Sequence, residues 1–211
     1  MPIEPAIQRL IDATPGFMPR VEGAYLHELA LISPGNSEHP LVEIGTYCGK
    51  STLYLACAAK ALSSTVITID HHKGSEENYP PFPYFDQRLR HRVSQDLETF
   101  NTFRDTLRLS NLTKRVMAVV GDSSNYAKFF PQGSAALVFI DGGHSSVQSW
   151  SDFIDWSPKL IQGGVLAIHD VFDDPAQGGR PPFEIVTALR HSKTFVELNQ
   201  VGSLAAFICS S

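Results

Sequence analysis

Apolar runs that alternate with helix-length segments most constrain the fold of this chain. The runs are Leu41–Ile44, Thr65–Ile69, Val116–Val120, Ala136–Ile140 and Gly164–Ile168. Such near-continuous apolar strands are typical of a parallel sheet with helices on both faces. Apolar residues recur at helical spacing in two of the connecting segments, Asp96–Leu109 and Val147–Leu160. The pattern predicts an α/β fold built on a Rossmann-like, doubly wound sheet.

The C-terminus departs from this alternation. Thr194–Asn199 and Ser203–Cys209 are both strand-like, and only a short turn around Gly202 separates them. So short a connection permits only an antiparallel hairpin. We therefore expect seven strands in all, mostly parallel, with an antiparallel hairpin at the C-terminus. An ordinary dinucleotide-binding domain has only parallel strands, so the hairpin argues against one.

The chain of 211 residues fits a single domain over 1–211. Two helical stretches, Ile3–Ala13 and Glu22–Ile32, precede the first strand. We expect residues 1–36 to form a helical cover over a core at 41–209. Packing against the sheet is the simplest role for this cover, and a substrate cover or a contact in a homo-oligomer is the alternative.

The overall charge and apolar pattern restrict the partners. A formal charge of −5 argues against nucleic acid or an anionic membrane surface as the main partner. No apolar run approaches the ~18–20 residues that span a bilayer, and the start of the chain does not resemble a signal peptide. Three cysteines, Cys48, Cys57 and Cys209, share no metal-ligand spacing. A cytoplasmic protein is the expectation.

A glycine-containing turn, Glu43–Ser51, follows the first strand and precedes a helix-like segment, Ser51–Leu62. Glycines let the backbone approach a ligand, and the free N–H groups of the helix start point toward it. Only three residues separate Gly45 from Gly49, whereas a phosphate-binding P-loop needs four. The spacing also differs from the G-x-G-x-x-G dinucleotide motif. The remaining pattern, acid-x-Gly-x-x-x-Gly, resembles motif I of class I S-adenosylmethionine-dependent methyltransferases.

Acidic residues follow four of the strands, at or near the point where each one ends. They are Asp70, Asp122, Asp141 and Asp170. Because the carboxyl ends of parallel strands meet at one edge of a sheet, these side chains predict a polar site there. Asp70 lies 21 residues beyond Gly49, the distance at which an acid accepts hydrogen bonds from ribose hydroxyls. That requirement is the same for NAD and for S-adenosylmethionine.

The second half of the chain extends the resemblance over about residues 20–209. Its most specific segment is Phe139-Ile140-Asp141-Gly142-Gly143-His144, followed by Gly163-Gly164 and then His169-Asp170. With the glycine turn, this order resembles small bacterial methyltransferases related to the macrocin O-methyltransferase and cephalosporin-biosynthesis groups. Catechol-type O-methyltransferases share the layout more distantly. The resemblance implies S-adenosylmethionine as the cofactor and a small-molecule acceptor.

The resemblance also assigns roles by position. The cofactor's methionine part is expected beside the turn residues Glu43, Gly45, Thr46, Tyr47, Gly49 and Ser51. Asp70 and His71 are expected at its ribose, and Asp122 and Ser123 near its adenine. Asp141 is expected to face the sulfonium.

Two alternatives remain for activating the acceptor. In metal-dependent relatives, the acid matching Asp141 and an acid pair after the fifth strand bind a divalent cation. Here Asp141 and Asp170 are present, but His169 stands beside Asp170, so both magnesium and a softer divalent metal remain alternatives. His144 is the alternative, as a general base. For the acceptor pocket we expect a wall from the aromatic segment Lys73–Phe85 and a lid from Asp173–Pro182.

The sequence thus predicts a methyltransferase that acts on oxygen of a small molecule. An NAD-dependent oxidoreductase is the enzyme alternative. The second alternative is a nucleoside-binding domain without catalytic activity.

Overall fold

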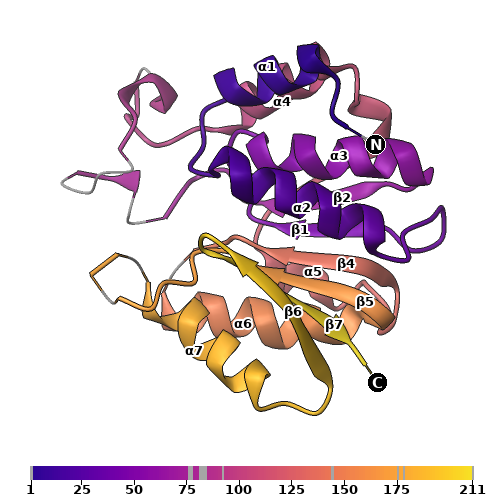
Figure 1. The fold of residues 1–211 in the computed structure, drawn as a ribbon. Helices are drawn as coiled ribbons and strands as arrows, with labels where there is room; N and C mark the ends of the chain where they lie inside the picture. Colours follow the sequence, from indigo (N-terminus) through magenta and orange to yellow (C-terminus); the bar gives the residue numbers. More distant parts are fainter. Residues whose placement is uncertain are drawn as a thin grey trace.

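The computed structural model describes residues 2–75, 78–80, 85–91, 93–143, 145–174, 176–177 and 179–210 (Figure 1). Two helices precede the sheet, α1 (Pro5–Ala13) and α2 (Arg20–Ile32). Strands and helices then alternate: β1 (Leu41–Ile44), α3 (Lys50–Leu62), β2 (Val66–Asp70), α4 (Phe100–Ser110), β3 (Val116–Val120), α5 (Ser123–Ala127), β4 (Ala135–Ile140), α6 (Ser146–Trp156), β5 (Leu160–Ile168) and α7 (Arg180–Arg190). The hairpin β6 (Phe195–Val201) and β7 (Leu204–Cys209) closes the chain.

The seven strands form one sheet in the order β3-β2-β1-β4-β5-β7-β6. β1 pairs in parallel with both β2 and β4, whereas β7 pairs antiparallel with β5 and with β6. The predicted fold class, a mostly parallel sheet with a C-terminal antiparallel hairpin, is confirmed. The strand order reverses between β1 and β4, and ligands of such sheets bind at that point.

Helices cover both faces of the sheet, as the apolar strands predict (Figure 1). Helices α1 to α4 share one core with alternate residues of the strands, such as Leu41 and Phe139. Helices α5 to α7 share the second core with the intervening residues, such as Val42 and Val138. The predicted N-terminal cover packs mainly on α3, and α2 also contacts β5, β6 and β7. None of the described helices is both long enough and apolar enough to cross a membrane.

Three predicted boundaries differ from the structure. The helix expected over Val147–Leu160 ends at Trp156, because Pro158 has no N–H to continue the hydrogen-bond ladder. The helix expected from Asp96 begins at Phe100, and Leu97 instead forms an antiparallel bridge with Arg90. The lid expected over Asp173–Pro182 ends in the first turn of α7, which begins at Arg180.

Candidate active site

The turn after β1 lies directly against the end of β4. Gly45 has a φ of +91°, and a Cβ placed on it would lie 2.1 Å from the backbone oxygen of Asp141. Gly49 has a φ of +89°, and a Cβ there would lie 2.8 Å from the ring of Phe103. Both positions therefore require glycine, for conformation and for space. This close approach joins two of the predicted site segments at the point where the strand order reverses.

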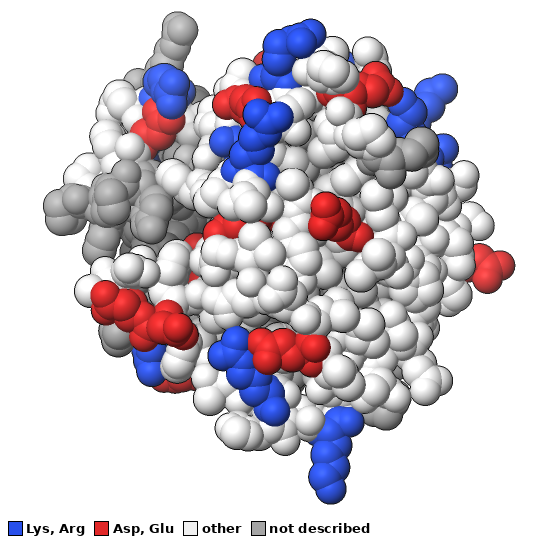
Figure 2. Space-filling model, in the orientation of Figure 1, with Lys and Arg blue, Asp and Glu red and all other residues white. Residues whose placement is uncertain are grey.

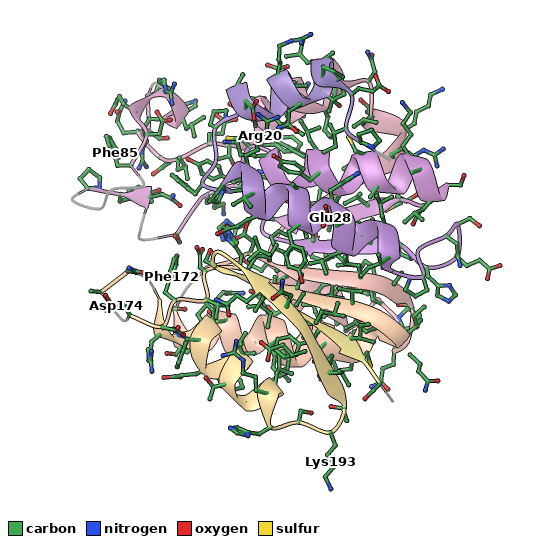
Figure 3. The ribbon with its side chains drawn as sticks, viewed as in Figure 1. Arg20, Glu28, Phe85, Phe172, Asp174 and Lys193 are labelled. Atoms are coloured by element: carbon green, nitrogen blue, oxygen red, sulfur yellow. The ribbon has the colours of Figure 1, made fainter. Side chains whose placement is uncertain are left out.

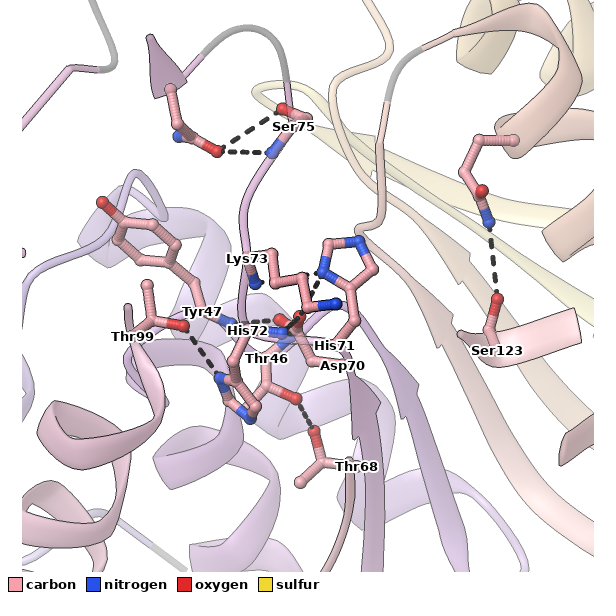
Figure 4. A network of polar contacts seen from close by, with 12 residues as sticks. Thr46, Tyr47, Thr68, Asp70, His71, His72, Lys73, Ser75, Thr99 and Ser123 are labelled. Carbon is pink, nitrogen blue, oxygen red and sulfur yellow. Dashed lines mark hydrogen bonds and ion pairs between the residues drawn. The ribbon is translucent and has the colours of Figure 1, made fainter. Parts of the chain in front are cut away.

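Asp70 holds the turn in place (Figure 4). Its Oδ2 accepts hydrogen bonds of 2.8 Å from the backbone N–H groups of both Thr46 and Tyr47. Its Oδ1 accepts a third bond, of 2.6 Å, from the N–H of His72. These bonds stabilise Tyr47 in a left-handed conformation with a φ of 50°, which is costly for a side chain of this size. A carboxylate has about four acceptor positions, so about one is left for a ligand.

The two histidines after β2 differ in their surroundings (Figure 4). The side chain of His71 is 40% exposed, and its Nδ1 accepts a hydrogen bond from the N–H of Lys73. His72 is buried against the ring of Phe103, and its Nδ1 lies 2.8 Å from the hydroxyl of Thr99. His71 is therefore the one whose ring can reach a bound molecule beside Asp70.

Glu43 lies beneath the turn and is fully buried. Its carboxylate accepts hydrogen bonds of 2.6–2.7 Å from the hydroxyls of Ser51, Thr52 and Thr68. Burial raises the pKa of Glu43 to about 7, against the lowering effect of these hydroxyls. The hydroxyl of Thr46 also bonds that of Thr68, so a network of hydroxyls and one carboxyl fixes the turn to β2 and α3. Glu43 thus supports the turn from below.

Ser123 and Asp122 begin α5 at the end of β3. Asp122 is exposed and occupies the N-cap position, but its side chain makes no capping hydrogen bond. The buried hydroxyl of Ser123 donates to Asp152 of α6, which also accepts a bond of 3.0 Å from Gln148. Burial raises the pKa of Asp152. Sequence reasoning gave no role to Gln148 or Asp152, because only the packing of α6 on α5 brings them to Ser123.

Asp141, His169 and Asp170 meet at the ends of β4 and β5. Nδ1 of His169 lies 3.0 Å from Oδ1 of Asp141 and 3.5 Å from Oδ1 of Asp170. Its Nε2 donates a hydrogen bond of 2.6 Å to the carboxylate of Glu22, which is buried at the start of α2. Burial opposes a charged imidazole here, but the surrounding carboxylates outweigh it and raise the pKa of His169 well above its usual value. Without a cation, the surrounding carboxylates therefore stabilise the charged form of the ring.

The same three residues have the composition of a metal site. One ligand atom of each, from Asp141, His169 and Asp170, lies within 4.8 Å of the others. Two carboxylates and one imidazole suit divalent cations such as Mn²⁺, Fe²⁺ or Zn²⁺. The bond from Nε2 to Glu22 also matches the usual second contact of a metal-bound histidine. The donor set thus fits a divalent cation, which would replace the proton on Nδ1.

A cavity of about 320 Å³ lies beside Tyr47. It is lined by residues 12–17, which form the end of α1 and the segment after it, by Tyr47, and by Phe85, Asp86 and Arg88. The rings of Phe17 and Tyr47 are 5.4 Å apart. Arg88 pairs with Asp86 at 2.6 Å, so the two charges compensate each other. Phe85 and Phe172 come from the segments after β2 and β5 and lie at the same side of the molecule (Figure 3).

Some predicted site residues lie outside the described part of the chain. His144, the predicted general base, is one of them, and so are parts of the Lys73–Phe85 wall and of the segment before α7. Glu22 was missed by sequence reasoning. As an acid at the predicted start of a helix it is an ordinary exposed residue, and only the position of α2 over β5 and the final hairpin buries it.

Comparisons with known proteins agree with the fold. The sequence model of the methyltransferase domain family matches residues 42–171. A protein of known structure from Corynebacterium glutamicum is similar, with a TM-score of 0.70 and 17% identity, over 100% of this chain and 92% of that one. The methyltransferase PaMTH1 of Podospora anserina, in its SAH-bound form, has a TM-score of 0.68 and 15% identity, over 99% of this chain and 89% of that one. The O-methyltransferase NovP has a TM-score of 0.61 and 18% identity, over 89% of this chain and 80% of that one.

Proposed function

The chain belongs to the methyltransferase domain family, and we propose that it transfers a methyl group from S-adenosylmethionine to an oxygen of a small molecule. One observation carries the cofactor assignment. The glycine turn is held in shape by Asp70 at the point where the strand order reverses, and it touches the end of β4 beside Asp141. The structural likeness to the SAH-bound PaMTH1 and to the O-methyltransferase NovP supports this choice of cofactor and acceptor atom.

In this proposal the glycine turn and the strand ends each bind a different part of the cofactor. The first N–H groups of α3, which have no partner within the helix, bind the carboxylate of the methionine part with Thr46, Tyr47 and Ser51 around it. The remaining acceptor position of Asp70 binds a ribose hydroxyl, with His71 beside it. Asp122 and Ser123 lie at the adenine.

The methyl group then leaves the sulfonium by in-line displacement. Holding the acceptor oxygen and the methyl group in line contributes up to ~7–11 kcal/mol to lowering the barrier. Asp141 faces the sulfonium from the end of β4. Asp141, His169 and Asp170 would hold a divalent cation, and a cation there would lower the pKa of an acceptor hydroxyl. His144 remains the proposed base if no cation is needed.

A small acceptor fits both the cavity and the charge of the molecule. The 320 Å³ cavity beside Tyr47 is within the range of small-molecule pockets, and its aromatic walls favour a flat or apolar group. Basic and acidic side chains are interspersed on the face shown in Figure 2, and the net charge is −5. A nucleic-acid acceptor would favour a basic surface instead.

A screen with S-adenosylmethionine carrying a labelled methyl group tests the proposal. Phenols, catechols, hydroxy acids and sugar hydroxyls form the first panel, each with and without Mn²⁺. Transfer of label to oxygen of one class is the expected result. Label on nitrogen or carbon would refute oxygen as the acceptor atom. Cofactor binding without transfer to any acceptor class would favour the non-catalytic nucleoside-binding alternative.

A further inference from the structure

Glu22 connects the N-terminal cover to the reacting end of the site. It lies in the first turn of α2, 147 residues before His169, yet both residues are only 4% exposed. Oε2 of Glu22 accepts the 2.6 Å hydrogen bond from Nε2 of His169. Its Oε1 accepts bonds of 2.7 and 3.2 Å from the backbone N–H and the hydroxyl of Ser203. The carboxylate is thus fixed on both oxygens.

The turn between β6 and β7 leaves room for this carboxylate. Gly202 has a φ of +59°, and a Cβ on it would lie 2.1 Å from Oε1 of Glu22. A side chain at this position would displace Glu22 from Ser203 and from His169. The final hairpin, α2 and the end of β5 therefore meet at this single carboxylate.

The bond to Glu22 decides which ring nitrogen of His169 faces the other acids. An ionised carboxylate only accepts hydrogen bonds, so Nε2 must carry a proton. The ring is then oriented with Nδ1 toward Asp141 and Asp170, at 3.0 and 3.5 Å. A nitrogen binds a cation only through a free lone pair, and Nδ1 is the one that can provide it here.

We propose that Glu22 is a positioning residue for the donor set of Asp141, His169 and Asp170. By keeping the proton on Nε2 and fixing the ring, it presents Nδ1 to a divalent cation. This inference rests on the metal site in the proposed function and adds the N-terminal helix to that site.

Two substitutions of Glu22 distinguish the effect of its negative charge from the effect of its position. In Glu22→Gln, the N–H of Ser203 keeps the amide oxygen on its own side, so the amide NH₂ faces Nε2 of His169. The ring must then accept at Nε2 and carry its proton on Nδ1, which blocks cation binding. Glu22→Asp keeps the charge but is one methylene too short to reach both partners. Glu28→Gln removes a charge from the exposed face of the same helix and serves as the control (Figure 3).

The test is calorimetric titration of each full-length variant with Mn²⁺, and in parallel with S-adenosylhomocysteine. We expect Glu22→Gln and Glu22→Asp to bind Mn²⁺ 10–100-fold more weakly than wild type, since second contacts of metal ligands have effects of about this size. Binding of S-adenosylhomocysteine should change less than threefold in both, which shows that they fold. Glu28→Gln should match wild type. Spectra with Co²⁺ give a second readout, because loss of an imidazole ligand shifts the visible bands.

Four results would overturn the proposal. Unchanged Mn²⁺ affinity in both Glu22 variants would show that the ring does not depend on this carboxylate. Weak binding in Glu22→Gln with normal binding in Glu22→Asp would show that only the charge matters. A wild-type protein that binds S-adenosylhomocysteine but not Mn²⁺ would remove the metal site and leave methyl transfer standing. If wild type binds neither, the proposed function fails as well.

Discussion

Glu43 shows how one carboxyl group supports the site from beneath. Its pKa of about 7 in the folded protein lies above the value of 4.5 expected when it is exposed, so the folded state holds the proton more tightly. Stability linked to this group is fully present below pH 4.5 and is lost as the pH rises to about 7. The shift corresponds to about 3 kcal/mol.

Glu43→Gln removes this titration and keeps the shape of the side chain. We expect the free energy of unfolding of wild type, compared with that of Glu43→Gln, to fall by about 3 kcal/mol between pH 4.5 and 7.5. Other titrating groups cancel in the difference between the two proteins. Urea denaturation at several pH values measures it, and parallel pH profiles would contradict the buried, proton-binding carboxyl.

Asp70 accepts hydrogen bonds from two backbone N–H groups of the turn. In Asp70→Asn only one of the two side-chain oxygens remains, so at least one of the bonds to the turn, to the N–H of His72 or to a ribose is lost. We expect the affinity for S-adenosylhomocysteine to fall by roughly 1.5–3 kcal/mol, typical of charge-assisted bonds. The control is Asp105→Asn on α4, whose side chain is 69% exposed. Equal affinities for the two variants, measured by calorimetry, would exclude Asp70 from cofactor binding.

For single residues, the sequence predicted the place of a side chain in the fold better than its hydrogen-bond partners. Asp70, Asp141 and Asp170 were expected at strand ends because a charged side chain is costly within a buried strand unless it is paired, and the structure places them at or just after those ends. That Asp70 would bind the protein's own amides was not predictable, since the conformation of the turn decides it. The buried partners Glu22 and Asp152 come from helices whose placement no local pattern encodes.

Among the elements, the turn between β1 and α3 has a strict backbone requirement. Gly45→Ala combines a left-handed conformation with a clash against the backbone oxygen of Asp141, so β1 and β4 must move apart. Gly133→Ala is the matched control, because Gly133 also has a positive φ, of +60°, but open space around it. The free energy of unfolding of this control should fall only by the cost of a left-handed conformation for alanine, about 1–2 kcal/mol.

We expect Gly45→Ala to lose at least ~2 kcal/mol more than Gly133→Ala in urea denaturation. This extra loss is in the range of overpacking in a close contact. It should also weaken binding of S-adenosylhomocysteine, whereas Gly133→Ala should not. If both variants are equally stable, the close approach of the two strand ends is not required.

The element boundaries show where local patterns stop being sufficient. Leu97 continues the helical spacing of α4, yet it packs with Cys48 and Leu89 beneath the glycine turn, so α4 begins three residues later. β5 begins at Leu160, four residues before the apolar run, because its pairing with β4 shifts register between Ala135 and Leu137. Such a shift depends on the neighbouring strand and leaves no signal in the segment itself.

For the whole molecule, the order of elements was predictable because topology depends on repeated patterns. Alternation of strands and helices requires parallel pairing, and the short turn at Gly202 requires the antiparallel hairpin. The cover formed by α1 and α2 was predicted as packing, and its link to the active site through Glu22 became visible only in three dimensions. The alternative role of this cover, a contact in a homo-oligomer, stays a prediction.

The central claim is that the glycine turn and the acidic strand ends bind S-adenosylmethionine. Thermal unfolding with S-adenosylhomocysteine, NAD and ATP, each at the same concentration, tests it most directly. The account predicts that S-adenosylhomocysteine at a hundredfold excess over its dissociation constant stabilises the fold by about 2.7 kcal/mol, while NAD and ATP do not. Stabilisation by NAD and none by S-adenosylhomocysteine would contradict it.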